Sequence, residues 1–448
     1  MNGARALAIA AVLVTGGTVS VQPGVTQARQ SLAPIERVEA ERRVADQELA
    51  RLEHDRLRLP DDDAVFADAA KTAWRYARDH VEPATGLIAP VRDYPFATIW
   101  DVGSMLAALY SAHELGLVDG RAYEARVSTI LGTLARVQRY DHAVYARSYD
   151  TRNGAMAQRR PDGGAVAGWS ALDIGRLLIW LRIIGTHPAF ADRTAGIVNR
   201  IDLGRIVHSG YLWGSDLDAT GKAVTYQEGR IGYEQYAAQG YRLWNARADK
   251  ALNLMENAVP ITIEGQALVA DVRREDRLNS EPFLLLGLEL GWDPPARRLV
   301  QRMLLAQEQR YRDTGALTIT GEDAIGLAPY YFYYYCVYTN GKQFGVDVQD
   351  RRAAVDGPRW LSTKSAFALQ ALMPGRYSEL ALRQLRGTEA PDGWASGIYE
   401  RTGKSTETPN INTAAVILTS ALVHQTGEPV LAHAQRSARS DLAGPGTP

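Results

Sequence analysis

The sequence predicts an all-α fold, an (α/α)6 toroid of six helix hairpins with small β-hairpins in its loops. Two observations support this prediction. Six segments are apolar on nearly every side of a helix, as expected for helices that are buried on every side. Each follows a charged amphipathic segment and a loop rich in glycine and aromatic residues, so one helix pair recurs along the chain. The pattern leaves a less regular all-α bundle open as an alternative.

The apolar segments are expected to form an inner ring, and the amphipathic segments an outer ring. The apolar helices are expected to begin near Trp100, Ser170, Ile231, Ser280, Ser362 and Asn412. Their amphipathic partners are expected over residues 64–80, 121–139, 190–208, 246–258, 294–311 and 377–386. The fourth partner has the thinnest pattern, and Pro260 ends it. Strand-like residues at 268–272, 317–320 and 330–338 predict short hairpins in the loops.

The N-terminal segment is typical of a signal peptide. Arg5 supplies a positive charge, and the apolar run at 6–14 is too short to span a bilayer. Small residues at Thr26 and Ala28 predict cleavage after Ala28, and hence a periplasmic or secreted protein. An uncleaved membrane anchor is the alternative.

The rest of the chain divides into three predicted parts. Residues 29–60 are densely charged and predict a helical spacer, residues 61–427 the toroid, and residues 428–448 a flexible tail. No later segment has the unbroken apolar length of a membrane helix, so the mature chain is expected to have no membrane span.

The composition is that of a folded protein and excludes several classes. The 448 residues include 50 Lys and Arg and 51 Asp and Glu, so the net charge of −1 lacks the basic excess of a general nucleic-acid-binding protein. Hydrophobic residues make up 46%, which excludes a wholly disordered chain. The single Cys336 excludes an internal disulfide framework and a multi-cysteine zinc site. The sequence predicts no cofactor, and it leaves the oligomeric state open.

Acidic and aromatic residues gather where the apolar helices begin. In a toroid these starts share one end, here called the rim, and point free N–H groups and positive dipole ends toward it. Burying a polar residue at the start of an apolar helix costs free energy unless the residue caps the helix or is paired with another group. Such residues are therefore candidates for a functional role. Aromatic rings stack on sugar rings, so the tyrosine run at 330–338 also draws attention. The predicted substrate-binding residues are Trp100, Asp173, Trp169, Tyr233, Glu281, Tyr333, Trp394 and Glu400.

Three further carboxyl groups are the catalytic candidates. Glu234 lies in the apolar stretch GYEQY, where burial would raise its pKa and suit it to act as a general acid. Asp101 and Glu228 are the candidates for the base. Each has a structural alternative, since Asp101 can cap its helix and Glu228 can face solvent in its loop. For Asp173 the alternative is a structural salt bridge. The acidic loops 216–218 and 347–350 leave a calcium site open, although such loops are usually only solvated.

Paired carboxyl groups indicate glycoside hydrolysis, which needs one protonated carboxyl and a second carboxylate. The sequence therefore predicts an exported glycoside hydrolase that acts on a bacterial polysaccharide such as a β-glucan. One alternative is a non-catalytic carbohydrate-binding or scaffold protein of exopolysaccharide export. Another is a polysaccharide lyase, which needs a Tyr or His base and a cation. The tyrosine run at 330–338 and His142 are candidates for the base, and Arg147 and Arg230 for the cation.

Several long blocks resemble the domain-of-unknown-function 3131 family. They are TAWRYARDHVEPATGLI, YPFATIWDVGSMLAALYSAHELGL, YARSYDTRNG, GWSALDIGRLLIWLRI and YQEGRIGYEQYAAQGYRLW, in this order within residues 65–425. More distantly, the chain resembles glucoamylase-like toroids that include bacterial β-1,2-glucan hydrolases. That resemblance implies Glu234 as the general acid and Asp173 as a subsite residue. It provides no unambiguous match for the base.

Overall fold

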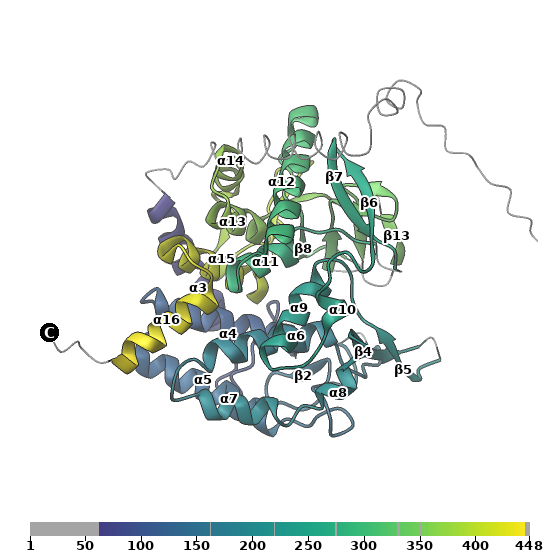
Figure 1. The fold of residues 1–448 in the computed structure, drawn as a ribbon. Coiled ribbons are helices and arrows are strands. Elements are labelled where there is room, and N and C mark those ends of the chain that lie inside the picture. The colour runs from purple at the N-terminus through teal and green to yellow at the C-terminus, as the bar shows by residue number, and fades with distance from the viewer. Residues whose placement is uncertain are drawn as a thin grey trace, which may run out of the picture. The chain divides into compact units, whose positions relative to one another are not determined.

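Six helices form a closed ring in the fold (Figure 1). The computed structural model describes residues 62–161, 163–218, 220–273, 276–328, 332–348, 351–355 and 357–443, all within the unit Asp55–Pro448. The ring helices are α4 (Ile99–Glu114), α6 (Ala171–Ile184), α9 (Tyr233–Leu243), α11 (Glu281–Glu289), α13 (Thr363–Leu372) and α15 (Ile411–Thr426). Each packs against the next in this order, and α15 packs against α4, which closes the ring. The predicted toroid is thus confirmed, with helix starts within two residues of the expected positions.

An outer set of helices packs against this ring. They are α3 (Asp62–Asp79), α5 (Gly120–Arg136), α7 (Ala191–Val198), α10 (Asp249–Leu252), α12 (Pro294–Thr314) and α14 (Arg376–Leu385). The single-turn helix α8 (Leu203–Ile206) packs mainly against the strands that follow it. The partner expected at 190–208 is divided into α7 and α8, because Asp202 caps a new turn through the N–H of Arg205. The partner expected at 246–258 is wrong beyond the single turn of α10, since a strand begins at Ala258.

Side-chain caps mark the start of three of the six ring helices, whereas α9, α11 and α13 begin without one. Thr98 caps α4 in a capping box with Asp101, Ser170 caps α6, and Asn410 caps α15 through the N–H of Thr413. Each cap satisfies an N–H group that the helix itself leaves without a partner. The positions of these three helix starts at the rim are therefore determined by residues close to them in the sequence.

Short strands occupy the connections, so the description all-α is not fully confirmed, although small hairpins in the loops were expected. The described residues contain seven small antiparallel sheets. They are β1 (Phe96–Thr98) with β2 (Ser148–Asp150); β3 (Val207–His208), β4 (Tyr211–Leu217) and β5 (Ala223–Gln227); β6 (Ala258–Ile263) with β7 (Gln266–Asp271); β8 (Gly321–Ala324), β9 (Phe332–Tyr335), β12 (Val346–Val348) and β13 (Arg351–Val355); β10 (Tyr338–Thr339) with β11 (Lys342–Gln343); β14 (Trp360–Ser362) with β17 (Gly397–Tyr399); and β15 (Glu389–Ala390) with β16 (Gly393–Trp394).

The three segments predicted as strand-like, 268–272, 317–320 and 330–338, are only partly strands in the structure. Strand β7 pairs with β6, whose β-branched residues favour a strand directly after the turn of α10. The segment 317–320 is not a strand, and the strand β8 that follows it pairs with β9 in the tyrosine run.

The C-terminal segment is helical where a flexible tail was predicted. Helix α16 (Val430–Ala443) packs against α15, α6 and α11. Val430 and Ala434 are buried, and His433 Nε2 lies 2.8 Å from Glu114 Oε2. The segment is rich in Ser and Arg, so its composition did not indicate that one side of a helix would be buried. The predicted signal peptide at 1–28 and spacer at 29–60 lie outside the described residues. None of the helices in the described ranges combines the length and apolar character needed to cross a membrane.

Glycines bring α6 and α9 into direct backbone contact. A Cβ atom on Gly240 would lie 2.0 Å from the carbonyl oxygen of Gly175, and one on Gly175 would lie 2.7 Å from that of Ala237. Real Cβ atoms do not approach so closely, so one of the two helices would have to move. This contact fixes the spacing of two neighbouring rim positions.

We expect Gly240→Ala to lower the free energy of unfolding by about 1–3 kcal/mol, the usual cost of overpacking a core. Gly196→Ala in α7 is the matched control, because no atom lies within 4 Å of its Cβ position. There the helix preference of alanine predicts a gain of up to about 1 kcal/mol. Urea unfolding of both variants measures the difference. Equal stabilities would show that α6 and α9 are free to separate.

Candidate active site

Asp101 acts as a helix cap in this structure. Its Oδ2 accepts hydrogen bonds from the Thr98 N–H at 2.8 Å and the Thr98 hydroxyl at 2.7 Å, and its Oδ1 accepts one from Asn412 at 3.0 Å. Burial raises the pKa of this carboxyl. Both oxygens hold partners and the side chain is buried, so the geometry favours the structural role over that of a base.

Glu234 is completely covered by neighbouring side chains. Its Oε2 lies 2.5 Å from Arg273 Nη1, and its Oε1 accepts a hydrogen bond of 2.7 Å from Gln227. Burial raises the pKa of Glu234 to about 7, although the charge of Arg273 opposes the shift. The side chain has the pKa expected of a general acid, but none of its surface is exposed. A substrate would reach it only if Arg273 or Gln227 moved.

Asp173 and Glu228 meet at the start of α6. The Ser170 hydroxyl donates to Asp173 Oδ1 at 3.0 Å, and the N–H of Ala171 donates to Glu228 Oε2. Glu228 follows β5 directly, and its own N–H bonds to Leu212 on β4. The carboxylate thus occupies an N-terminal helix position, where negative charge is favoured.

The environment of Asp173 suits it to hold a proton near neutral pH. Burial, and next the negative charge of Glu228, raise the pKa of Asp173 to about 7, while Arg147 opposes the shift. Asp173 as a whole is partly exposed, although its carboxyl group is closely surrounded by other atoms. A carboxyl group whose pKa is raised close to a second acidic side chain is the pattern of a general acid and its partner. This pair is the best acid and base arrangement among the sequence candidates.

Two predicted aromatic residues lie together at the rim. The half-buried ring of Trp100 lies 5.6 Å from the ring of Tyr233, measured between centroids. The guanidinium of Arg176 lies 4.7 Å from the centre of the Trp100 ring. Trp100 thus keeps part of its ring exposed, as stacking on a sugar requires.

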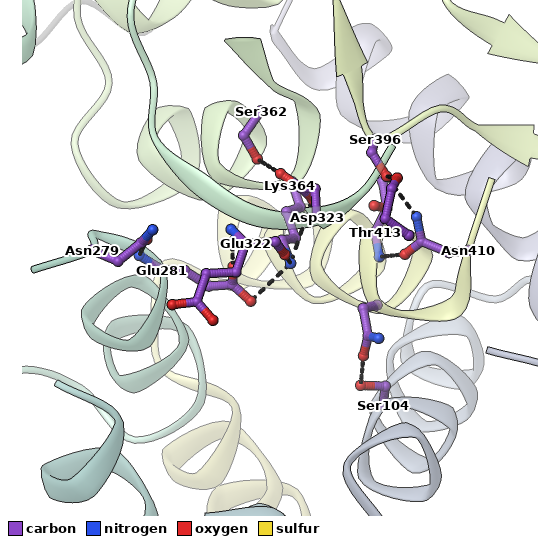
Figure 2. A network of polar contacts seen from close by, with 12 residues as sticks. Ser104, Asn279, Glu281, Glu322, Asp323, Ser362, Lys364, Ser396, Asn410 and Thr413 are labelled. Carbon is purple, nitrogen blue, oxygen red and sulfur yellow. Dashed lines mark hydrogen bonds and ion pairs between the residues drawn. The ribbon is translucent and has the colours of Figure 1, made fainter. Parts of the chain in front are cut away.

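A second charged cluster surrounds Lys364 (Figure 2). The Lys364 ammonium donates to Glu281 Oε1 at 2.8 Å and lies 3.5 Å from Asp323 Oδ1. Glu281 also accepts a hydrogen bond from the N–H of Glu322, and Glu322 binds Arg230 through both carboxylate oxygens. Burial raises the pKa values of Glu322 and Asp323. Because these groups are paired with one another, they stabilise the loop that carries β8.

Sequence analysis singled out Glu281 from this cluster but missed Glu322 and Asp323. The two adjacent acidic residues in TGEDA, at the end of an apolar stretch, were the only available signal. Within the described residues, no group of three or more His, Cys, Asp or Glu side chains is placed to hold a metal ion.

Two of the three tryptophans predicted to bind sugar lie in the interior. Trp169 is 1% exposed and donates its indole N–H to the Trp213 carbonyl at 2.8 Å. Trp394 is 6% exposed and donates to the Ala69 carbonyl at 3.1 Å. Their ring faces are covered by the packing of the wall, so neither ring is a stacking platform here. Sequence position next to a helix start did not distinguish them from Trp100.

Two other predicted substrate residues have structural roles in the wall, Tyr333 as a buried residue and Glu400 as a partly exposed member of an ion pair. Tyr333 is 4% exposed and lies on β9 opposite Asp323. Glu400 pairs with Arg310 of α12 at 2.8 Å, which ties the loop after β17 to the outer wall. Packing and ion pairing account for both residues in this structure.

Comparisons with known proteins agree with this architecture. The family model described as protein of unknown function (DUF3131) matches residues 68–427. No curated protein matches the chain. Among solved structures, the chain is similar to a glucoamylase candidate from Bacteroides caccae, with a TM-score of 0.61 and 14% identity, covering 85% of this chain and 98% of that one.

Two endo-β-1,2-glucanases share the same fold. One is from Chitinophaga pinensis, in complex with sophorotriose and glucose, with a TM-score of 0.60, 13% identity and coverage of 86% of this chain and 98% of that one. The other is from Talaromyces funiculosus, in complex with sophorose, with a TM-score of 0.56, 11% identity and coverage of 84% and 86%. These likenesses establish the toroid fold. The family match spans most of the sequence, and the chain therefore belongs to the DUF3131 family of proteins of unknown function.

Proposed function

We propose that the protein is an exported glycoside hydrolase that cleaves a bacterial polysaccharide such as a β-glucan, with Asp173 as general acid and Glu228 as the second carboxylate. The observation that carries the proposal is the partly exposed Asp173, whose pKa is raised to about 7 beside Glu228 at the start of α6. Similar toroids that include endo-β-1,2-glucanases support a glucan as the substrate. The signal-peptide pattern of residues 1–28 supports export.

The chemistry requires two tasks from this pair. Protonated Asp173 donates its proton to the leaving glycosidic oxygen, while the Glu228 carboxylate takes a proton from the attacking water. Trp100 offers an aromatic face at the same rim for a sugar ring. No metal is needed for either proton transfer.

The site geometry favours this assignment over Glu234. The resemblance to glucan hydrolases implied Glu234 as the acid, and its pKa is also raised to about 7. Its proton would have to pass Arg273 and Gln227, which hold both carboxyl oxygens. Asp173 needs no such rearrangement.

The geometry gives less support to a polysaccharide lyase. A lyase needs a cation that can neutralise the carboxylate of its substrate, and both candidate arginines already face acidic side chains. Arg230 binds Glu322, and Arg147 lies 3.3 Å from Asp216. His142 lies on an exposed loop.

Product release from a panel of polysaccharides tests the proposal. We expect the purified protein to release reducing sugars from a neutral glucan, with β-1,2-glucan as the first candidate, and not from uronic-acid polymers. Glu228→Gln should lower the rate at least about 100-fold, as loss of acid–base catalysis does. Unsaturated products absorbing in the ultraviolet would instead establish a lyase. Glycan binding without any product, in wild type and variant alike, would establish the scaffold alternative.

A further inference from the structure

One arginine joins three segments next to the proposed catalytic pair, through its backbone N–H and its guanidinium. Arg147 lies just before β2, and its backbone N–H bonds to the Gly168 carbonyl at 3.2 Å. Its Nε and Nη2 donate to the Ser215 carbonyl of β4 at 3.1 and 2.9 Å. The same Nη2 donates to the Tyr226 hydroxyl of β5 at 2.7 Å. Arg147 therefore fixes the hairpin β4–β5 to the chain segment that leads into α6.

The hairpin in turn carries Glu228. Tyr226, two residues before Glu228, has its hydroxyl 3.5 Å from Glu228 Oε1. On the facing strand, a Cβ on Gly214 would lie 2.4 Å from Glu228 Oε2, so only glycine leaves room for the carboxylate there. Glu228 thus lies between the hairpin and the first N–H group of α6, and a shift of the hairpin would move it away from Asp173.

The charges around this pair come from several elements. Arg147 faces Glu228, Tyr226 and Asp216. Asp173 faces Glu228 and Arg147 and, more weakly, Asp101 on α4. Burial, and next the negative charges of Glu228 and Asp173, raise the pKa of Tyr241 on α9. The Tyr241 hydroxyl donates a hydrogen bond to the Ala171 carbonyl. Among these neighbours Arg147 supplies the positive charge, so it balances the repulsion between Glu228 and Asp173.

We propose that Arg147 is the positioning residue of this site, whose guanidinium holds the hairpin β4–β5 so that the Glu228 carboxylate stays at the start of α6 beside Asp173. This inference rests on the proposed function for its catalytic consequence, but the placement of Glu228 is independent of any activity. An arginine with no positioning role at the surface would have a mostly exposed guanidinium. Here the side chain is only 18% exposed, and its donors are directed to the hairpin.

Two substitutions separate the charge of Arg147 from its geometry. Arg147→Gln removes the cation that lowers the pKa of Asp173, so the alkaline limb of the activity profile should move to higher pH. Its kcat should fall more than about 10-fold while KM changes less, because the Glu228 carboxylate is no longer held in its exact position, although its charge stays near Asp173. Arg147→Lys keeps the charge but not the fork that binds Ser215, so it should restore the wild-type alkaline limb with a kcat still below normal.

A second readout needs no substrate. The carboxyl carbon of Asp173 can be followed by NMR during a pH titration, with Asp173→Asn used to assign the signal. The Asp173 pKa should rise in Arg147→Gln and fall in Glu228→Gln, since these variants remove opposite charges. Unchanged titrations in both variants would overturn the inference, whatever the activity.

The failure of this inference is distinguishable from that of the proposed function. If the protein is inactive on every glycan but the Asp173 titration shifts as described, the placement of Glu228 by Arg147 holds and the hydrolase assignment falls. If the protein is active and Arg147→Gln lowers only the melting temperature, with the pH profile and titration unchanged, Arg147 is a stabilising residue and the inference is wrong.

Discussion

Asp173→Asn is expected to abolish glycan cleavage, lowering kcat at least about 100-fold and up to about 10,000-fold. Asparagine has the same shape but cannot donate the proton that the leaving oxygen needs. In the wild type, activity should fall as pH rises through about 7, because the proton on Asp173 is then lost. Initial rates between pH 5 and pH 9 on the cleaved glycan measure both effects.

Stability separates this catalytic role from a structural one. The pKa of Asp173 is raised from 3.8 in an ordinary setting to about 7 in the fold. The unfolded chain therefore loses this proton more readily, and the folded state becomes less stable as pH rises from 3.8 toward 7. Asparagine avoids this cost, so Asp173→Asn should melt at an equal or higher temperature than wild type at pH 8.

Two controls make the Asp173 result decisive. Glu264→Gln changes a carboxyl in the turn between β6 and β7 and should leave the rate unaltered. Glu234→Gln removes the other carboxyl with a raised pKa. Full activity of Asp173→Asn together with an inactive Glu234→Gln would transfer the acid role to Glu234.

Arg176→Met is expected to lower the free energy of unfolding by about 3–5 kcal/mol, the cost of breaking a buried ion pair. The side chains of Arg176 on α6 and Glu289 on α11 are each 1% exposed, with 3.0 Å between Nη1 and Oε1. Tyr236 on α9 bonds to both groups, so the network spans three ring helices. Methionine would leave Glu289 as an uncompensated buried carboxyl, whose pKa burial already raises.

Denaturant unfolding of a variant pair tests this result. The double variant Arg176→Met with Glu289→Leu removes both charges and should recover most of the lost stability, since a buried pair replaced by apolar groups is often neutral. A single Arg176→Met variant as stable as wild type would show that the pair contributes little to the ring. Circular dichroism at 222 nm follows the helices in all three proteins.

Part of the site could be predicted because helix starts are local features. Ser170 and Asp173 lie three residues apart, so capping and the apolar run that follows place Asp173 at the rim without any tertiary information. Trp100 reaches the rim for the same reason, since Thr98 caps α4, whereas Tyr233 begins α9 without a side-chain cap and is buried. Trp169 and Trp394 occupy similar sequence positions but are buried, because segments distant in the chain cover their rings.

The sequence by itself determined the sixfold ring, since an apolar surface on every side of a helix requires burial wherever that helix lies. It did not determine that 430–443 would be helical, because that segment is stabilised by packing against three ring helices. Only the tertiary structure decided which carboxyl groups form ion pairs, which take part in helix caps and which have a pKa near neutral pH. A pKa depends on burial and on charges nearby in space, and Glu228 reaches the start of α6 from 57 residues away. These neighbours are the reason why we propose Asp173, and not Glu234, as the general acid.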